Sequence, residues 1–512
     1  MSTVPGLQRN MVTICAMTAT IMQALDTTIA NVALPYMQGT LSASQDQINW
    51  VLTSYIVAAA IMTAPVGWIA NRFGRKRTFI ICSAGFTVAS VLCGLAQDIN
   101  QMVLFRLLQG VFGAALVPLS QAVMLDMYSL QERAKAMSIW GMGVMMGPIM
   151  GPSLGAWLTE TYSWHWVFFV NLPFGIITVL GLMVFMDETK QDTELRFDWF
   201  GFAALAIAIG ALQVALDRGE QLGWFESNEI IAEFVISIAG FYYFFAHSFT
   251  TDRPFIQFAL FRDRNFLTGC IFMTVMGLVL YSTMALASPY LQNVIGYPII
   301  TAGVLLASRG CGTFVAMMMV GRLMRYIEAR TLIITGLSIT ALSLYTMTAW
   351  TDQTGAQEIV IISIIQGFGF GLVFVPLSTV AFMTLPNNLR TDGTSMLTLM
   401  RNVASSIGIS IVIAQLTDGG RRIYAILSEH ITPFNQALQM PDVHSMINLG
   451  TDKGRAMADV MVAIQAQIIA FSQDYQLVMI FIVCSIPLAI MIGSTKAALR
   501  HQAPAADHAV ME

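Results

Sequence analysis

The chain has 512 residues, of which 56% are hydrophobic and only 11% are charged. Charged residues make up about a quarter of soluble domains, so this composition excludes an ordinary soluble protein and indicates one that crosses a membrane many times. The net charge of −4 says little, because the placement of Lys and Arg matters more than their sum in a membrane protein. The six cysteines lie in apolar runs without C-x-x-C spacing, which is typical of buried core residues and not of disulfides or metal ligands.

Apolar runs of membrane-spanning length follow one another along the chain. A helix that crosses a bilayer needs about 20 mostly apolar residues, and on this criterion the sequence predicts an all-α membrane protein with fourteen spans. They lie at about residues 11–34, 48–70, 78–97, 102–125, 137–158, 165–186, 199–217, 229–249, 266–289, 299–324, 331–350, 357–384, 394–417 and 475–495. Lys and Arg concentrate in the segments that are cytoplasmic if the N-terminus is inside, which predicts that both termini are cytoplasmic.

The first and fourth spans each contain one deeply placed charged residue. An ionisable side chain inside a membrane is costly and therefore functional by default. Asp26 lies about 13 Å from Pro35 at helical rise, and Arg106 lies about 8 Å from Gln101, so the two could meet where both helices line a cavity. We expect Asp26 to carry a proton and Arg106 to set its affinity. The pair could instead be a static support, or Asp26 could bind cationic substrates only.

Polar residues elsewhere in the spans predict a substrate cavity. Thr27, Thr28 and Asn31 form a polar face with Asp26, and the many methionines and phenylalanines offer soft apolar surface for varied ligands. Arg309 and Arg401 in spans ten and thirteen could serve transport or could be structural donors to helix-end carbonyls. The residues expected at the cavity are Asp26, Thr27, Asn31, Gln109, Arg309, Gln366 and Arg401.

Span five carries a stripe of glycines with four-residue spacing. Such a stripe lets the backbone of another helix approach closely, and two prolines on a neighbouring stripe bend the helix. The pattern suits a helix that slides or rocks against its neighbour, although ordinary tight packing is the alternative. The stripe consists of Gly143, Gly147, Gly151 and Gly155, and the prolines are Pro148 and Pro152.

An internal repeat divides the chain. Pro35-Tyr-Met-Gln38 recurs 254 residues later as Pro289-Tyr-Leu-Gln292, and the same offset relates Gly67 to Gly321. The repeat predicts two six-helix bundles, at residues 1–190 and 251–512, with an inserted two-helix hairpin at 191–250. We also expect a long outer loop at 418–474 with an amphipathic helix at 452–473, which either packs on the rim of the protein or docks a partner.

No motif indicates an enzyme. Gly151-Pro-Ser153-Leu-Gly155 matches the G-x-S-x-G pattern of hydrolases, but that chemistry needs a strand, a strained turn and a helix, whereas this serine lies in an apolar helical run. The sequence has no P-loop for ATP and no HExxH or Cys/His cluster for a metal. We therefore expect no cofactor.

Several motifs resemble one family. Leu25 to Pro35 matches a first-helix motif, Gly67 to Arg77 a loop motif, Arg106-Leu-Leu-Gln109-Gly110 a fourth-helix motif, and the glycine stripe the antiporter signature GxxxGPxxG. Together they resemble the fourteen-span EmrB/QacA-type drug:proton antiporters of the major facilitator superfamily. Asn71 stands where the loop motif usually has Asp. The conformational motifs comprise Gly67, Asn71, Arg72, Gly74, Arg75, Arg77, Gly143, Gly147, Pro148, Gly151, Pro152 and Gly155.

The resemblance implies a function and a set of partners. It implies export of hydrophobic or amphipathic toxic compounds across the inner membrane by alternating access, driven by the proton gradient, with Arg106 in proton coupling. The long loop resembles the EmrB branch, which implies a periplasmic adaptor protein and an outer-membrane channel besides small substrates, protons and lipid, and no nucleic acid. Two alternatives stay open: an exporter of a dedicated metabolite such as a siderophore or lipid, and a transport-inactive membrane receptor or scaffold.

Overall fold

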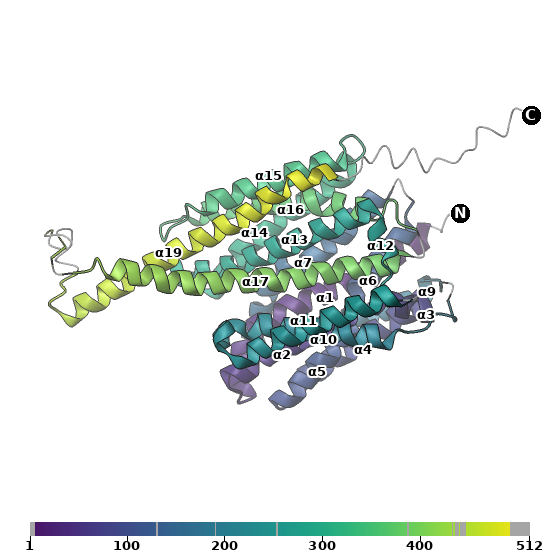
Figure 1. The fold of residues 1–512 in the computed structure, drawn as a ribbon, viewed down its shortest axis with the longest axis horizontal. Coiled ribbons are helices and arrows are strands. Elements are labelled where there is room, and N and C mark those ends of the chain that lie inside the picture. Colours follow the sequence, from purple (N-terminus) through teal and green to yellow (C-terminus); the bar gives the residue numbers. More distant parts are fainter. Residues whose placement is uncertain are drawn as a thin grey trace, which may run out of the picture.

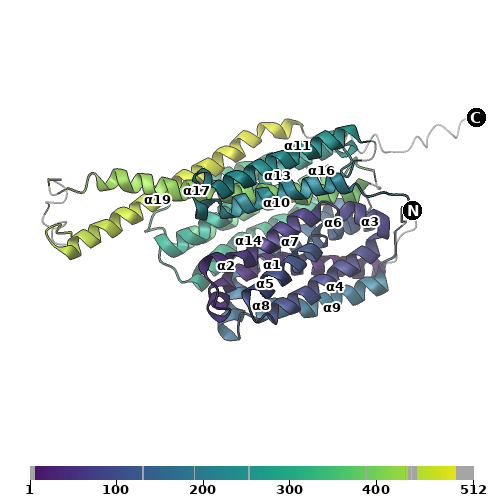
Figure 2. The same cartoon turned by 60° about the horizontal axis from the view of Figure 1, so that its bottom comes forward.

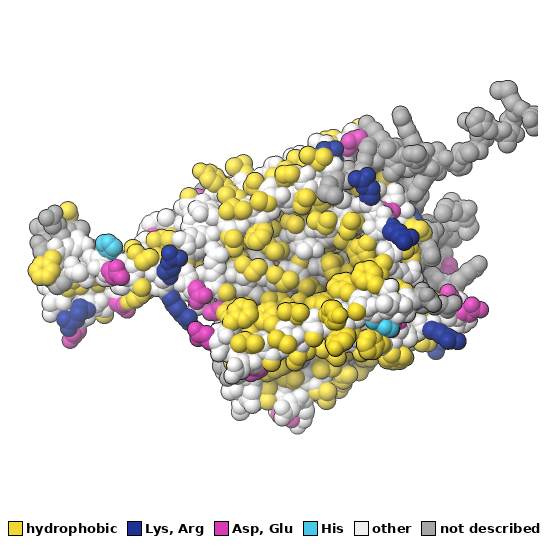
Figure 3. All heavy atoms as spheres, in the orientation of Figure 1, with side chains coloured by type: hydrophobic (Ala, Val, Ile, Leu, Met, Phe, Trp, Pro, Cys, Tyr) yellow, Lys and Arg dark blue, Asp and Glu magenta, His cyan; other side chains and the backbone are white. Residues whose placement is uncertain are grey.

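Long apolar helices make up nearly all of the described chain. The computed structural model describes residues 6–129, 132–189, 191–251, 254–386, 389–432, 434–435, 440 and 447–491, and these residues contain no strand. Figure 1 shows the helices running side by side along one direction. Figure 3 shows apolar side chains over the middle of one face, with charged side chains near its ends, as expected for a protein surrounded by lipid.

The helices form two bundles with a hairpin between them. The N-terminal bundle consists of α1 (Gly6–Thr40), α2 (Gln45–Thr63), α3 (Val66–Phe73), α4 (Arg75–Gly94), α5 (Ile99–Gly113), α6 (Leu116–Met127), α7 (Arg133–Thr161), α8 (Trp166–Phe169) and α9 (Asn171–Phe185). The inserted hairpin consists of α10 (Trp199–Leu222), η1 (Trp224–Glu226) and α11 (Asn228–Thr250). The C-terminal bundle consists of α12 (Ala259–Arg262), α13 (Arg264–Pro289), η2 (Tyr290–Val294), α14 (Ile299–Leu323), α15 (Ala329–Met347), α16 (Ala356–Ala381), α17 (Arg390–Ser428), α19 (Asp452–Ser485) and η5 (Pro487–Met491).

Fewer than the expected fourteen helices meet the length and hydropathy criteria for a membrane span. In the described part of the chain, 12 helices are long and apolar enough to cross a membrane, and the bent pair α2–α3 raises the number to 13. The pair bends by 55° near Pro65, which cannot donate a backbone hydrogen bond. The expected span at 137–158 corresponds to α7, which is 29 residues long but rich in glycine and proline and is not among these helices. The count of fourteen is thus not confirmed.

The expected loop at 418–474 is largely helical: the helix expected at 452–473 is present, whereas the expectation of a loop is wrong for residues 418–428. α17 continues to Ser428, and α19 begins at Asp452 and runs without a break into the last span. With 39 and 34 residues, these helices are about 58 and 51 Å long, whereas the apolar core of a bilayer is about 30 Å thick. Figures 1 and 2 show both helices extending beyond the bundles. We call residues 418–428 and 452–470 the helical projection.

Two ends of the molecule can be distinguished. The motif end holds the loop around Gly74 and the beginning of α1, and the helical projection leaves from the opposite end (Figure 1). The two bundles meet in a nearly symmetric way. Gly67 of α3 lies against Asp392 of α17, and Gly321, its counterpart in the repeat, lies against Lys135 and Ser138 of α7. Each glycine therefore sits where a helix of the other bundle approaches closely.

The inserted hairpin covers one side of the junction between the bundles. α10 packs on both α2 and α17. Ser410 of α17 donates a hydrogen bond to the carbonyl of Leu216 at 2.8 Å, and Gln213 donates to Ser406. Elsewhere at the junction, Trp140 of α7 stacks on Phe374 of α16 with ring centroids 5.8 Å apart. Polar contacts thus fix the hairpin where α2 and α17 would otherwise face lipid.

Candidate functional site

Asp26 lies at the centre of a buried polar cluster in the N-terminal bundle. Its side chain is 0% exposed, and Arg106 is 1% exposed. One carboxylate oxygen accepts a hydrogen bond from Nη1 of Arg106 at 2.7 Å, and the other accepts from Gln109 at 2.7 Å and from Asn171 at 3.1 Å. The contact between Asp26 and Arg106 that the sequence predicts is therefore present.

Aromatic rings and a backbone carbonyl hold the guanidinium of Arg106. It lies 4.3 Å from the ring centroid of Tyr55 and 5.7 Å from that of Phe168, and its Nε donates to the carbonyl of Val51 at 3.1 Å. Arg106 and Gln109 share one face of α5 because they are three residues apart. A buried ion pair needs such additional hydrogen bonds, since removing two charges from water is otherwise too costly.

Sequence reasoning missed Asn171. It begins α9, donates to Asp26 and also donates to Ser90 at 3.0 Å, and Ser90 in turn donates to the carbonyl of Phe168 at 2.9 Å. The available signal was the one that identified Asp26, a polar side chain in an apolar span. The cluster thus connects α1, α4, α5 and α9. A change in the charge of Asp26 would therefore alter the contacts between four helices.

The loop motif around Gly74 anchors the beginning of α4. Gly74 has φ of 93°, a left-handed conformation that favours glycine. The carboxylate of Glu188 accepts hydrogen bonds from the backbone N–H groups of Lys76 and Arg77, each at 3.1 Å, which places a negative charge at a helix N-terminus. Arg72 reaches the carbonyl of Asp192 at 3.4 Å. The motif therefore fixes the chain after α9 to the start of α4.

Polar contacts close the motif end between the bundles. Asp126 at the end of α6 accepts from Arg75 of its own bundle and from Arg390 of the C-terminal bundle, the latter at 2.7 Å. Asn71 donates to Asp392 of α17 at 3.4 Å. A carboxylate at position 71 would face a second carboxylate, so the unusual Asn matches an acid that α17 supplies. We call these contacts of Asp126 and Asp392 the motif-end gate. Sequence reasoning missed both of these acids.

The glycine stripe of α7 faces α1. Gly147 lies against the backbone of Ala24, and Thr28 donates a hydrogen bond to the carbonyl of Gly147 at 3.0 Å. The other members of the stripe lie against further α1 side chains: Gly143 against Met17, Gly151 against Thr28 and Gly155 against Ile29. The close approach therefore joins α7 to the helix that carries Asp26, within one bundle. Another face of α7 meets α14, where Pro152 and Ser153 lie near Gly303. The side chain of Pro148 lies outside the described residues.

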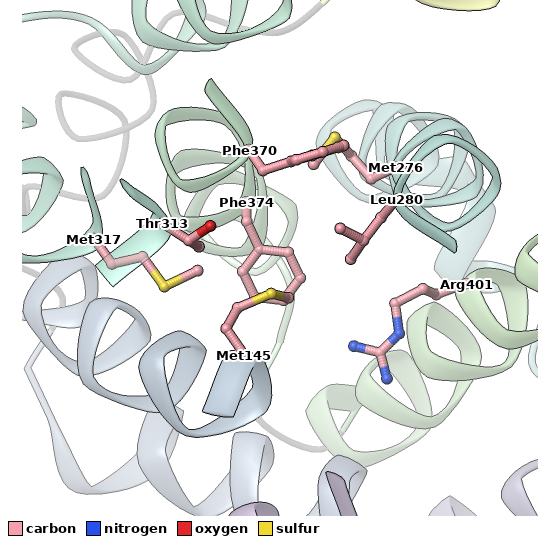
Figure 4. A pocket seen from close by; sticks show the side chains of 8 residues that line it. All are labelled: Met145, Met276, Leu280, Thr313, Met317, Phe370, Phe374 and Arg401. Carbon is pink, nitrogen blue, oxygen red and sulfur yellow. The ribbon is translucent and has the colours of Figure 1, made fainter. Parts of the chain in front are cut away.

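A small pocket lies at the junction of the two bundles (Figure 4). Its lining comes from one residue of the N-terminal bundle, Met145, and seven of the C-terminal bundle, Met276, Leu280, Thr313, Met317, Phe370, Phe374 and Arg401. Its volume is about 10 Å³, roughly the space of one water molecule. In this conformation the pocket is therefore nearly filled by its own side chains.

Of the residues expected at a substrate cavity, Arg401 lines this pocket and the other six do not. Asp26 and Gln109 belong to the buried cluster, and Asn31 is exposed. The remaining three contact their own surroundings: Thr27 donates to the carbonyl of Ala24 at 2.8 Å, Arg309 donates to Thr283 at 3.2 Å, and Gln366 lies 3.8 Å from the sulfur of Met347. A substrate role for these six stays a prediction.

Metal-binding side chains do not gather in the described residues. No group of three or more His, Cys, Asp or Glu residues there could hold a metal ion. The arrangement consists instead of a buried ion pair, a gate between bundles and a pocket at their junction.

Comparison with known proteins identifies the family. Residues 16–409 match the Major Facilitator Superfamily. The chain is 35% identical over 437 residues to the multidrug export protein EmrB of Escherichia coli K12, covering 85% of each chain. It is 32% identical over 427 residues to the fatty acid resistance protein FarB of Neisseria gonorrhoeae, covering 83% of this chain and 84% of FarB.

Solved structures of low sequence identity share the fold. A bacterial homolog of the human lysosomal transporter Spinster superimposes with a TM-score of 0.55 at 16% identity, covering 95% of this chain and 98% of that one. The human organic anion transporter MFSD10 gives 0.57 at 12% identity, covering 93% and 99%. The match to the family and to EmrB identifies the chain as a multi-pass membrane transporter, and it belongs to the Major Facilitator Superfamily.

Proposed function

We propose that this protein is a proton-coupled antiporter that exports hydrophobic or amphipathic toxic compounds across the inner membrane by alternating access. The ion pair of Asp26 and Arg106 carries this proposal, because it is a fully buried acid–base pair between two membrane-spanning helices. Relatives that match over most of the chain include a multidrug export protein and a fatty acid resistance protein, which supports export of small amphipathic compounds.

The cluster gives protonation a structural consequence. While Asp26 is ionised, its two oxygens accept three hydrogen bonds and hold α1 to α5 and α9. A proton on Asp26 removes the charge that balances Arg106, and breaking a buried pair in this way costs about 3–5 kcal/mol. That energy is large enough to change the preferred arrangement of the helices. In the proposed cycle Asp26 takes its proton from the outer side and releases it inward, with Arg106 setting its affinity.

The second part of the cycle is opening and closing at the motif end. We place this end in the cytoplasm, together with both termini, because Arg72, Arg75, Lys76, Arg77 and Arg133 concentrate there. With the motif-end gate closed and the pocket nearly filled, substrate has no route to the cytoplasm. Opening requires the contacts of Asp126 with Arg390 and of Asn71 with Asp392 to break, while α7 and α14 separate around the pocket.

The helical projection gives the exporter a docking surface on the outer side. It extends beyond the bilayer and presents Met457, Val460 and Met461 as exposed apolar side chains. Contiguous apolar surface away from lipid is typical of a protein interface. We propose that it binds a periplasmic adaptor protein connected to an outer-membrane channel.

Simultaneous measurement of substrate and protons tests the function. The purified protein is reconstituted into liposomes that contain a pH-sensitive dye, and an amphipathic fluorescent substrate is added with and without an imposed pH gradient. The proposal predicts uphill substrate movement with the gradient, and proton movement in the opposite direction when substrate is added. Substrate movement that ignores the gradient, or gradient decay that ignores substrate, would contradict it.

A further inference from the structure

Arg401 is the charged side chain among the eight residues that line the pocket between the bundles. Besides Thr313, its neighbours there are methionine, leucine and phenylalanine side chains. Thr313 is already occupied, since its hydroxyl donates to the carbonyls of Arg309 and Gly367 at 3.1 and 3.0 Å. Figure 4 shows Arg401 reaching from α17 toward this space. The pocket is thus an apolar site with one cationic group.

The guanidinium of Arg401 has no partner among the residues that the structure describes. It is 8% exposed, its Nε is buried without a hydrogen-bond acceptor, and it forms no ion pair with a described acid. Arg401 lies eleven residues into α17, about 16 Å from the beginning of that helix and near the middle of a bilayer. A buried cation at this depth is costly unless something supplies negative charge.

Asp26 does not supply that charge. All three hydrogen bonds to its carboxylate come from within the N-terminal bundle, and the side chain is 0% exposed. Neutralisation of Arg401 by Asp26 would therefore require the Asp26 cluster to be dismantled. A ligand that carries its own negative charge avoids this cost.

We infer that the pocket binds amphipathic anions, with an oxyanion such as a carboxylate or sulfonate on Arg401 and an apolar body against the methionines and phenylalanines. The inference rests on the proposed export function and names its substrate class. A guanidinium presents several N–H donors in a fork that matches an oxyanion, and methionine side chains adapt to varied apolar shapes. A cation would meet the like charge of Arg401 in a medium of low dielectric.

The small volume of the pocket agrees with a site that forms during the transport cycle. At about 10 Å³ it cannot hold such a ligand in this conformation. Met145 comes from α7, whereas the rest of the lining comes from the C-terminal bundle, so separating the bundles would widen the pocket. An anion would then enter as the bundles part, with Arg401 already buried beside it.

Three ligands with the same aromatic body separate the charge classes. Naphthalenesulfonate is an anion, naphthyltrimethylammonium a cation and naphthol neutral, and all three fluoresce. Equilibrium binding to the full-length protein in lipid nanodiscs should be tightest for the anion. Arg401→Gln should weaken anion binding at least about tenfold, as expected for the loss of a charge-assisted hydrogen bond, and should leave naphthol binding within about twofold.

Two further variants make the result specific. Arg401→Lys keeps the charge and should retain part of the anion preference. Arg322→Gln removes the same charge from an exposed position of α14 and should change nothing. The inference is overturned if the cation binds the wild type as tightly as the anion, or if Arg401→Gln weakens all three ligands equally. Gradient-driven transport of naphthol with no anion preference would overturn this inference alone, whereas no gradient-driven transport of any ligand would overturn the proposed function.

Discussion

Replacing Asn71 with Asp should open the motif end of the protein. Asn71 donates a hydrogen bond to Asp392 at 3.4 Å in the closed motif-end gate. The substitution removes that bond, which is worth about 1 kcal/mol, and places two carboxylates face to face. Two unit charges about 4 Å apart near a protein surface repel by about 4 kcal/mol. The sum of about 5 kcal/mol is an upper bound, because one carboxylate can take up a proton.

Such a change is large enough to reverse a conformational equilibrium. About 5.5 kcal/mol moves a two-state equilibrium from 1:99 to 99:1, so a substantial open population is expected in Asn71→Asp. Spin labels can be attached at the exposed positions Arg77 and Arg325, which lie at the motif ends of the two bundles. Double electron–electron resonance spectroscopy then measures the distance between the two labels. The distribution should shift to longer distances in Asn71→Asp.

The exchanged pair provides the matched control. Asn71→Asp combined with Asp392→Asn restores one donor and one acceptor across the same gap, so the closed distribution should return. The reasoning is refuted if Asn71→Asp keeps the wild-type distances, or if the exchanged pair opens the gate as much as the single variant does.

Three other perturbations follow from the same contacts. Gly147→Leu should reduce dye efflux about tenfold or more without loss of expression, because a side chain at this position meets the backbone of Ala24. Gly39 has open space around it, so Gly39→Leu should be tolerated and serves as the control. Asn171→Ala removes a buried donor to Asp26 and should lower the free energy of unfolding by about 1–3 kcal/mol, measured by thermal denaturation in detergent. Serine at the three exposed apolar positions of the helical projection, Met457, Val460 and Met461, should abolish adaptor copurification and leave liposome transport unchanged.

Much of the fold could be predicted because lipid imposes simple rules. An apolar run must form a helix, since unpaired backbone groups are too costly in a bilayer, and the repeat that relates Pro35 to Pro289 reveals two bundles. The same rules failed at residues 418–428, where α17 continues although a loop is expected. Length alone cannot distinguish a loop from a helix that continues into water, because the helix there is stabilised by its pairing with a second helix. Tyr424 and Asp459, for example, bond across the helical projection.

The candidate site was predictable only in part. Asp26 and Arg106 are identified because placing an ionisable side chain inside a membrane costs free energy. The helical rise per residue places the two side chains at compatible depths. The role of Arg390 is not apparent from sequence, because a charge at the end of a span usually faces water. Its contact with Asp126 depends on how two bundles dock, and docking is fixed by side-chain packing far from either residue. For the same reason, the sequence does not reveal that the glycine stripe of α7 packs against α1.

Transport of a neutral substrate by Asp26→Asn tests the central claim most directly. Amide and carboxylate have nearly the same shape, so the variant keeps one of the two acceptor oxygens of the cluster but cannot carry a proton. In liposomes with an imposed pH gradient, the variant should bind the neutral substrate and exchange it downhill, yet fail to accumulate it. Accumulation of that substrate against its concentration gradient by Asp26→Asn, at a rate near that of the wild type, would show that Asp26 is not the proton carrier.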